Sequence, residues 1–324
     1  MEKARISSTQ LFLLLSGFLF GSTVILAPAR GAKNDAWLAM LLGGAGGVLL
    51  MWIYTAIALL NPSKTLVDIL KEKLGKVAGN ILAVLYTWYF IHLASLVLRD
   101  FGEFICTVTF PETPMAVVIG LFALIMVYAI NSGIEVIGRL SELLVPVIAL
   151  IASIISLSLI TVYDFTAFLP ILENGIKPVL NTAFNFITFP FGETVAFLML
   201  FPHVNKKEKL KKVVLVSAAV STFLVIILFF RDIFVLGSDL LARSSFIPHL
   251  TSLLIPGLNV EPLVDINLLI GGGVKISVCI YAAAKALSQI AGIDDYRTLT
   301  GAISTFCVVL SIWEYENVLE MFNW

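Results

Sequence analysis

Two charged residues stand inside long apolar stretches of the sequence, and they are the side chains best suited to bind a polar ligand there. Glu193 follows Pro190 and Gly192 in the run FNFITFPFGETVAFLMLF, and Lys275 lies midway along another apolar run. A carboxylate inside a bilayer is costly unless it faces a cavity or a partner. Glu193 therefore has two interpretations: it receives a ligand ammonium or carries a proton, or it makes a structural hydrogen bond that holds a broken helix.

Lys275 is the one cation of the sequence that cannot be assigned to a membrane interface. Burial favours the neutral form of a lysine, whereas a nearby acid favours the charged form. One interpretation is that Lys275 pairs with Asp265 or Glu193 as a packing contact.

The stretch FLFGSTVILAPAR (18–30) interrupts the first apolar run with Gly21, Ser22 and Thr23. Three interpretations are open. A helix break frees backbone N–H and C=O groups, and the N-terminus of a half-helix attracts a carboxylate, which suits a zwitterion. Alternatively, MEKAR, the apolar run and APA at 27–29 form a signal peptide, or the small residues let two helices approach closely.

The composition predicts an integral membrane protein. The chain has 324 residues, of which 59% are hydrophobic and 13% charged, with a mean hydropathy of +0.99. Soluble domains have about 45–50% apolar and about 25% charged residues, and one helical crossing takes roughly 20 apolar residues. We therefore expect an all-α polytopic fold in a single transmembrane domain, 1–324. Its nine predicted spans are 7–29, 36–60, 79–107, 114–131, 142–163, 179–203, 213–236, 262–288 and 298–316.

Lysine and arginine are unevenly distributed between the two sides of the predicted spans. Most of them lie on the cytoplasmic side if the N-terminus is cytoplasmic, as the positive-inside rule favours. Nine crossings then place the C-terminus outside. The loop 61–78 is basic and amphipathic and is expected to meet anionic lipid. The KKEKLKK run at 206–212 is interpreted as a topology anchor and not as a nucleic-acid site.

Catalytic and cofactor sites are not indicated by the sequence. Cys106, Cys279 and Cys307 lack metal-ligand spacing, and no dinucleotide, haem or Walker pattern is present. No set of nucleophile, base and acid can be assembled. We expect no enzyme, no cofactor and no metal.

The two interrupted spans are the first and the sixth. Interrupted segments in corresponding positions of two halves indicate a transporter-type binding site. This spacing predicts inverted repeats made of spans 1–5 and 6–10, of which the tenth is missing because only four spans, the sixth to the ninth, are left for the second repeat.

The sequence resembles the B subunit of spore germinant receptors, a branch of the amino acid–polyamine–organocation transporter superfamily. The resemblance rests on ISSTQLFLLLSGFLFGSTVILAP, LRDFGEFI with PETP, GRLSELLVP, FPFGETVAFLMLFP and VKISVCIYAAAKALSQIAGIDDYRTL. It implies a LeuT-like inverted-repeat bundle with broken spans 1 and 6. It also implies a subunit of a three-part receptor in the spore inner membrane, with A-type and C-type partners and a small germinant, commonly an amino acid.

By placement in the resembling fold, the germinant lies between spans 1 and 6, walled by spans 3 and 8. In that fold spans 1 and 8 can flank a sodium site, so a second interpretation of Lys275 is a tethered substitute cation that makes the protein sodium-independent. The expected ligand-binding residues are Gly21, Ser22, Thr23, Tyr89, Leu93, Phe191, Gly192, Glu193, Ser277 and Tyr281.

Two other functions use the same features. A secondary transporter of amino acids or organic cations needs the same pocket, so the sequence does not separate it from a receptor. A structural subunit with a vestigial pocket is compatible with the missing span.

Overall fold

The fold is all-helical, as the sequence predicts. The computed structural model describes residues 5–26, 29–255, 260–316 and 320, without the side chains of residues 22–26. Within these residues, regular structure is helical apart from one isolated β-bridge between Ile6 and Val204. The α-helices are α1 (Ser8–Leu26), α2 (Ala36–Leu60), α3 (Leu66–Phe104), α4 (Met115–Asn131), α5 (Ile134–Ser158), α6 (Ile176–Phe186), α7 (Leu210–Arg243), α8 (Ile247–Leu253), α9 (Glu261–Ala291) and α10 (Arg297–Trp313).

Short 3₁₀ and π segments join several of these helices. Each predicted span contains a helix. Helix α5 begins at Ile134, earlier than the predicted residue 142, and the charged side chains of its first turns lie toward the surface. The short segments are Arg30–Asp35, Ile105–Thr109, Ile160–Val162, Ile187–Phe191, Gly192–Met199, Phe201–His203 and Lys207–Lys209.

Five helical stretches among the described residues are long and apolar enough to cross a membrane. Shorter apolar helices accompany them at Ser8–Gly21, Met115–Asn131 and Arg297–Trp313. The five long stretches are Arg30–Leu60, Leu66–Thr109, Ile134–Ser158, Lys207–Arg243 and Glu261–Ala291.

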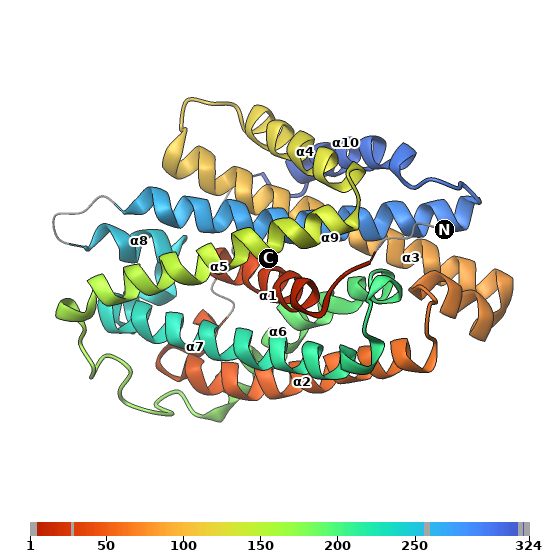
Figure 1. Cartoon of the computed structure of the whole chain (residues 1–324). Coiled ribbons are helices and arrows are strands. Elements are labelled where there is room, and N and C mark those ends of the chain that lie inside the picture. Colours follow the sequence, from red (N-terminus) through yellow and green to blue (C-terminus); the bar gives the residue numbers. More distant parts are fainter. Residues whose placement is uncertain (1–4, 27–28, 256–259, 317–319, 321–324) are drawn as a thin grey trace.

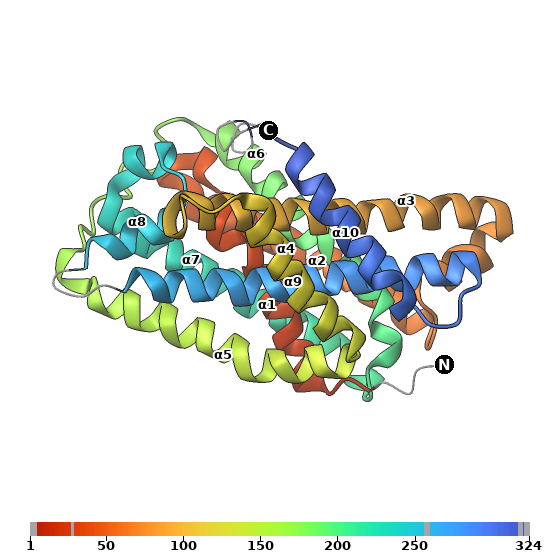
Figure 2. The same cartoon turned by 90° about the horizontal axis from the view of Figure 1, so that it is seen from above.

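Helices α1 and α9 form the centre of the bundle. In Figure 1, α4 and α10 lie along one edge and α2 and α7 along the opposite edge, with α9 and α1 between them. Figure 2 shows α5 and α3 on opposite sides of α9. Every residue from Ile270 to Ala284 of α9 is buried. A side chain of α9 therefore faces protein from several helices at once.

The crossing of α1 and α9 corrects the prediction of a broken span 1. Helix α1 is continuous through Gly21, Ser22 and Thr23 to Leu26. A Cβ atom added to Gly21 would lie 2.4 Å from the backbone oxygen of Gly271, and one added to Gly271 would lie 2.9 Å from the Cα of Gly21. Position 21 therefore has no room for a side chain, because the backbones of α1 and α9 are in contact there. This agrees with the third interpretation of this stretch, in which small residues let two helices approach closely. The predicted cleavage motif at 27–29 includes residues 27 and 28, which lie outside the described residues.

Span 6 is broken, as predicted. Helix α6 passes into the π segment Ile187–Phe191, in which Phe189 has φ −129° and ψ 114° and the Phe189–Pro190 peptide is cis. The chain then continues as the 3₁₀ segment Gly192–Met199. Proline lacks a backbone donor and clashes with the preceding helical turn, which explains why the α-helix ends here. Glu193 follows this break directly.

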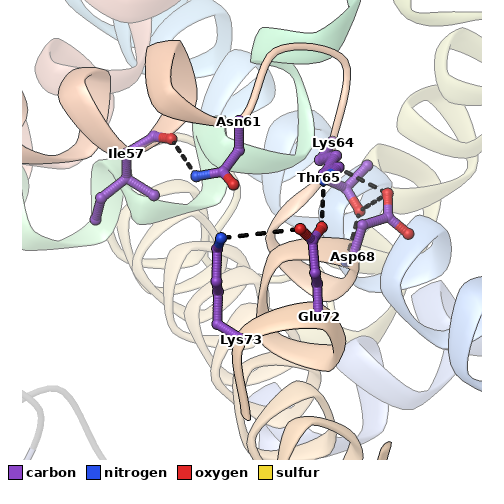
Figure 3. A network of polar contacts seen from close by, with 7 residues as sticks. All are labelled: Ile57, Asn61, Lys64, Thr65, Asp68, Glu72 and Lys73. Atoms are coloured by element: carbon purple, nitrogen blue, oxygen red, sulfur yellow. Dashed lines mark hydrogen bonds and ion pairs between the residues drawn. The ribbon is translucent and has the colours of Figure 1, made fainter. Parts of the chain in front are cut away.

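The connection from α2 to α3 forms a helical hairpin at the end of the bundle that also holds Ile6. Thr65 caps α3 through a capping box with Asp68, and Lys64 and Lys73 pair with Glu72 in Figure 3. The figure also shows the Asn61 side chain donating to the Ile57 carbonyl. These contacts fix the segment on which α3 begins.

Gly75, with φ +79°, reverses the chain within α3 and separates residues 66–74 from the long part of the helix. The short helix 66–74 is then tied to the C-terminal turn of α9. Lys71 Nζ donates to the Gln289 carbonyl at 2.8 Å, and Thr65 Oγ1 donates to Gln289 Oε1 at 2.9 Å. The amphipathic segment expected from the sequence is therefore a helix attached to the central helix.

Contacts between elements far apart in the sequence occur at both ends of the bundle. At the Ile6 end, Ile6 N–H donates to the His203 carbonyl at 2.9 Å, and the His203 ring contacts the Tyr281 hydroxyl. At the opposite end, the Phe246 ring beside α8 packs edge-on against Phe104 of α3 with ring centroids 5.1 Å apart.

Candidate functional site

A buried ion pair joins the broken span 6 to the central helix. Lys275 Nζ lies 2.5 Å from Glu193 Oε2, and the two side chains are 0% and 7% exposed. Unpaired charges at this depth would be strongly unfavourable, so each side chain needs the other as its partner. This pairing agrees with the interpretation that linked Lys275 to Glu193 or Asp265.

Asp265 has other partners. Thr109 Oγ1 donates to Asp265 Oδ2 at 3.0 Å, and His249 Nδ1 lies 3.6 Å from Asp265 Oδ1. Of the two acids predicted for Lys275, Glu193 is therefore the one it meets.

Two aromatic rings surround the Lys275 ammonium. The Nζ atom lies 4.6 Å from the ring centroid of Phe189 in the break and 5.4 Å from that of Phe18 in α1. A ring face attracts a cation more strongly when water is absent. The ammonium thus lies where α1, α9 and the two halves of span 6 meet. Helix α1 also packs closely on the stem of Lys275, since a Cβ added to Gly21 would lie 3.3 Å from the Lys275 Cβ.

A cavity of about 550 Å³ lies on the α2 and α3 side of the break. Tyr54, Tyr86, Tyr89 and Gly192 are among its lining residues. The Tyr54 hydroxyl donates to the Gly192 carbonyl at 3.3 Å. Gly192 connects this cavity to Glu193 along the chain, and so to the ion pair.

The predicted site residues do not all share this cavity. Tyr89 and Gly192 line it, whereas Leu93 is buried and the Phe191 ring packs against α2 at Gly47 and edge-on against Phe186.

Two further elements, α4 and the segment Phe201–His203, contact the predicted residues of α9. Ser277 Oγ donates to Met126 Sδ of α4 at 3.2 Å, and Tyr281 contacts His203. The side chains of Ser22 and Thr23 lie outside the described residues.

Sequence reasoning missed Tyr54 and Tyr86 in the cavity and Phe18 and Phe189 around the ammonium. An aromatic residue in an apolar run has the same composition signal whether it faces lipid or a ligand. The spacing of Tyr86 and Tyr89 at i, i+3 on one helix face was the available indication. Among the described residues, no group of three or more His, Cys, Asp or Glu is arranged to hold a metal ion.

A second buried polar cluster joins α3 to the C-terminal end of α10. Arg99 NH2 lies 2.5 Å from Glu103 Oε1, and Arg99 NH1 donates to the carbonyls of Ser311 and Ile312 at 3.1 Å. A guanidinium here satisfies carbonyls that the helix leaves unpaired and compensates the helix dipole. Glu314 continues the cluster by accepting from Ser95 and pairing with His92 at 2.9 Å.

We predict that Arg99→Lys destabilises the attachment of α10 by about 1–2 kcal/mol, because a lysine cannot reach Glu103 and two carbonyls in one plane. Unfolding of the purified protein in mixed micelles, followed by circular dichroism, measures this change. Arg139→Lys is the matched control, since the Arg139–Glu135 pair is exposed and 3.9 Å long. Equal stability of the two variants would show that the guanidinium contacts contribute nothing.

Comparison with known proteins gives the family. A family model described as spore germination protein matches residues 5–318. Spore germination protein KB of Bacillus subtilis (strain 168) is 35% identical over 334 aligned positions, which cover 100% of this chain and 88% of the relative.

Solved structures share the fold at low sequence identity. Mhp1, a nucleobase-cation-symport-1 family transporter in a closed conformation with bromovinylhydantoin bound, has a TM-score of 0.70 and 14% identity, covering 99% of this chain and 74% of Mhp1. MhsT in complex with L-phenylalanine has a TM-score of 0.71 and 14% identity, covering 100% of this chain and 86% of MhsT. The bundle therefore has a LeuT-like transporter fold, and its long apolar helices make it a multi-pass membrane protein. With the family match across nearly the whole sequence, this chain belongs to the spore germination protein family.

Proposed function

We propose that this chain is the germinant-sensing subunit of a spore germination receptor. It binds a small zwitterion, an α-amino acid, beside the break in span 6 and signals to A-type and C-type partner subunits in the spore inner membrane, with its N-terminus in the cytoplasm. The observation that carries the proposal is the buried Lys275–Glu193 ion pair at the break.

An amino acid is the charge complement of this ion pair. Its ammonium can take the place of Lys275 at Glu193 while its carboxylate meets the Lys275 ammonium. One buried ion pair then becomes two without a change in net charge, which keeps every charge compensated at membrane depth. Because α1 is continuous at Gly21–Thr23, Lys275 replaces the half-helix N-terminus as the proposed partner of the ligand carboxylate.

Signalling needs two arrangements that the ligand distinguishes, since a ligand shifts an equilibrium only through different affinity for its two states. The break allows the two halves of span 6 to change their relative orientation. Irregular backbone of this kind is stable at membrane depth only where protein or a cavity surrounds it. Opening the Lys275–Glu193 contact removes the ion pair that links the segment Gly192–Met199 to α9. The ligand-filled and ligand-free arrangements thus differ at the central helix.

The test is a germination assay on spores in which this chain and its partner subunits are the sole receptor, exposed to a panel of amino acids. Glu193→Gln is expected to raise the concentration for half-maximal response by about 10- to 100-fold, the effect of losing a charge-assisted hydrogen bond. Glu208→Gln, at an exposed position, is the matched control. Responses that are equal in both variants would contradict a ligand contact at Glu193.

A secondary transporter is the second candidate, and its support is the likeness to the transporter folds of Mhp1 and MhsT. The purified chain in proteoliposomes would then accumulate a labelled amino acid by itself. A germination defect on deletion without uptake supports the receptor instead. If no amino acid of a broad panel stabilises the purified chain against heat, a structural subunit with a vestigial pocket is the better description.

We predict that the amino-acid response does not need sodium. The Lys275 ammonium already places a fixed positive charge between α1, α9 and the break, where a bound cation would otherwise be required. Replacing sodium by N-methylglucamine at constant ionic strength should leave thermal stabilisation by the amino acid unchanged within twofold. A dependence on sodium concentration would refute the substitute-cation role.

A further inference from the structure

The cavity between α2, α3 and the break has properties that an amino-acid site does not explain. It measures about 550 Å³, within the range of roughly 300–1,000 Å³ that small-molecule sites occupy. None of its lining residues carries a charge, and leucines such as Leu82 and Leu85 make up much of its wall. A zwitterion would lose its hydration there without gaining a charged partner, so the chemistry of the wall selects a neutral, largely apolar ligand.

Two hydroxyl groups in this cavity have no hydrogen-bond partner among the residues that the structure describes. Tyr86 and Tyr89 contact the Phe90 ring, but neither phenol donates to a protein acceptor. The other two hydroxyls of the wall are used, since Tyr54 donates to Gly192 and Thr188 donates to the Asn185 carbonyl. A donor without an acceptor is costly in hydrocarbon surroundings. A ligand with an accepting oxygen would satisfy both phenols.

The cavity is accessible from the bilayer. Helix α2 packs on α6 and α7, and α3 packs on α9 and α10, so the two helices that flank the cavity do not close it by packing on each other. Leu85 is 56% exposed on α3, and its neighbours Ile81 and Val84 are exposed as well. A molecule dissolved in the acyl-chain region can therefore enter sideways between α2 and α3.

We propose that this cavity is a second binding site, distinct from the Lys275–Glu193 site, for a neutral lipid-soluble molecule that carries a carbonyl or ester oxygen. The apolar body of the ligand lies against Leu82 and Leu85, and its oxygen accepts from Tyr86 and Tyr89. The ligand reaches the site from the membrane and touches Gly192 at the break. This site goes beyond the proposed germinant function and does not depend on it.

The test is photolabelling of the purified full-length chain in phosphatidylcholine nanodiscs. The probe is the methyl ester of a ten-carbon fatty acid that carries a diazirine, and the comparison probe is the same diazirine hydrocarbon without the ester. We expect saturable labelling of the peptides that contain residues 50–54 and 82–89 by the ester, mapped by mass spectrometry. The hydrocarbon should label these peptides weakly and without saturation.

Tyr86→Phe with Tyr89→Phe should raise the ester concentration for half-maximal labelling by about tenfold, because the rings remain and only the hydrogen bonds are lost. Tyr128→Phe is the matched control, since Tyr128 is 78% exposed on α4. Leu82→Trp, which fills the cavity, should abolish saturable labelling. Equal labelling by both probes, or labelling unchanged in the double tyrosine variant, would show that acyl chains fill the cavity without recognition and would overturn the proposal.

Discussion

Lys275→Met is expected to lower the free energy of unfolding by about 3–5 kcal/mol, since it leaves the Glu193 carboxylate buried without its cation. Adding Glu193→Met to the same chain should restore most of this loss, because two apolar side chains of similar volume replace a buried ion pair at little or no cost. Unfolding in mixed micelles, followed by circular dichroism, measures both variants.

The double variant also separates stability from recognition. If the ion pair binds the ligand, Lys275→Met/Glu193→Met folds but gives no amino-acid response in spores. If the pair only holds the break closed, the double variant keeps the response. A single variant as stable as the unchanged chain would contradict the buried pairing itself.

Gly21→Ala is expected to destabilise the bundle by about 3 kcal/mol, at the upper end of overpacking effects. The added methyl would lie 2.4 Å from the Gly271 oxygen and 2.8 Å from its carbonyl carbon, and backbone atoms cannot move away as a flexible side chain can. Helices α1 and α9 must separate, which also displaces Lys275. We expect membrane insertion to persist and the germinant response to fall.

Gly192→Ala is the matched comparison. A Cβ at Gly192 meets its nearest neighbour, the Ile187 carbonyl oxygen, at 3.7 Å, which is ordinary contact. Its thermal midpoint should therefore stay within a few degrees of the unchanged chain, while Gly21→Ala loses far more. Equal losses in both variants would mean that the close α1–α9 crossing does not limit stability.

The sequence predicted the all-helical bundle, the break at Pro190 and a pairing of Lys275 with an acid such as Glu193. These features follow from local physics: apolar runs of membrane length, a proline that removes a backbone donor, and charges that need a partner in lipid. Each of them can be seen in one stretch of sequence without knowing which helix lies beside it.

The prediction of a helix break at Gly21 was wrong because the role of this glycine depends on a contact that its own stretch of sequence does not show. Small residues in an apolar run weaken a helix, but they also let another backbone approach, and Gly17 and Gly21 have the four-residue spacing typical of helix contacts. Only the position of Gly271, 250 residues later in the chain, decides between the two. The tyrosine cavity was missed for the same reason, because Tyr54 and Tyr86 come together only when α2 and α3 are placed on either side of the break.

The attachment of Gln289 to the helix 66–74 has a consequence for how the protein reports a ligand. Helix α9 runs without interruption from Lys275 to Gln289, about 21 Å at 1.5 Å per residue. A tilt or rotation of α9 at the ion pair must therefore either carry Lys71 and Thr65 along or break their bonds to Gln289. A movement of α9 at the ion pair is thus expected to change the distance between helix 66–74 and the N-terminal end of α1, which spin labels on these two segments would measure without altering the site.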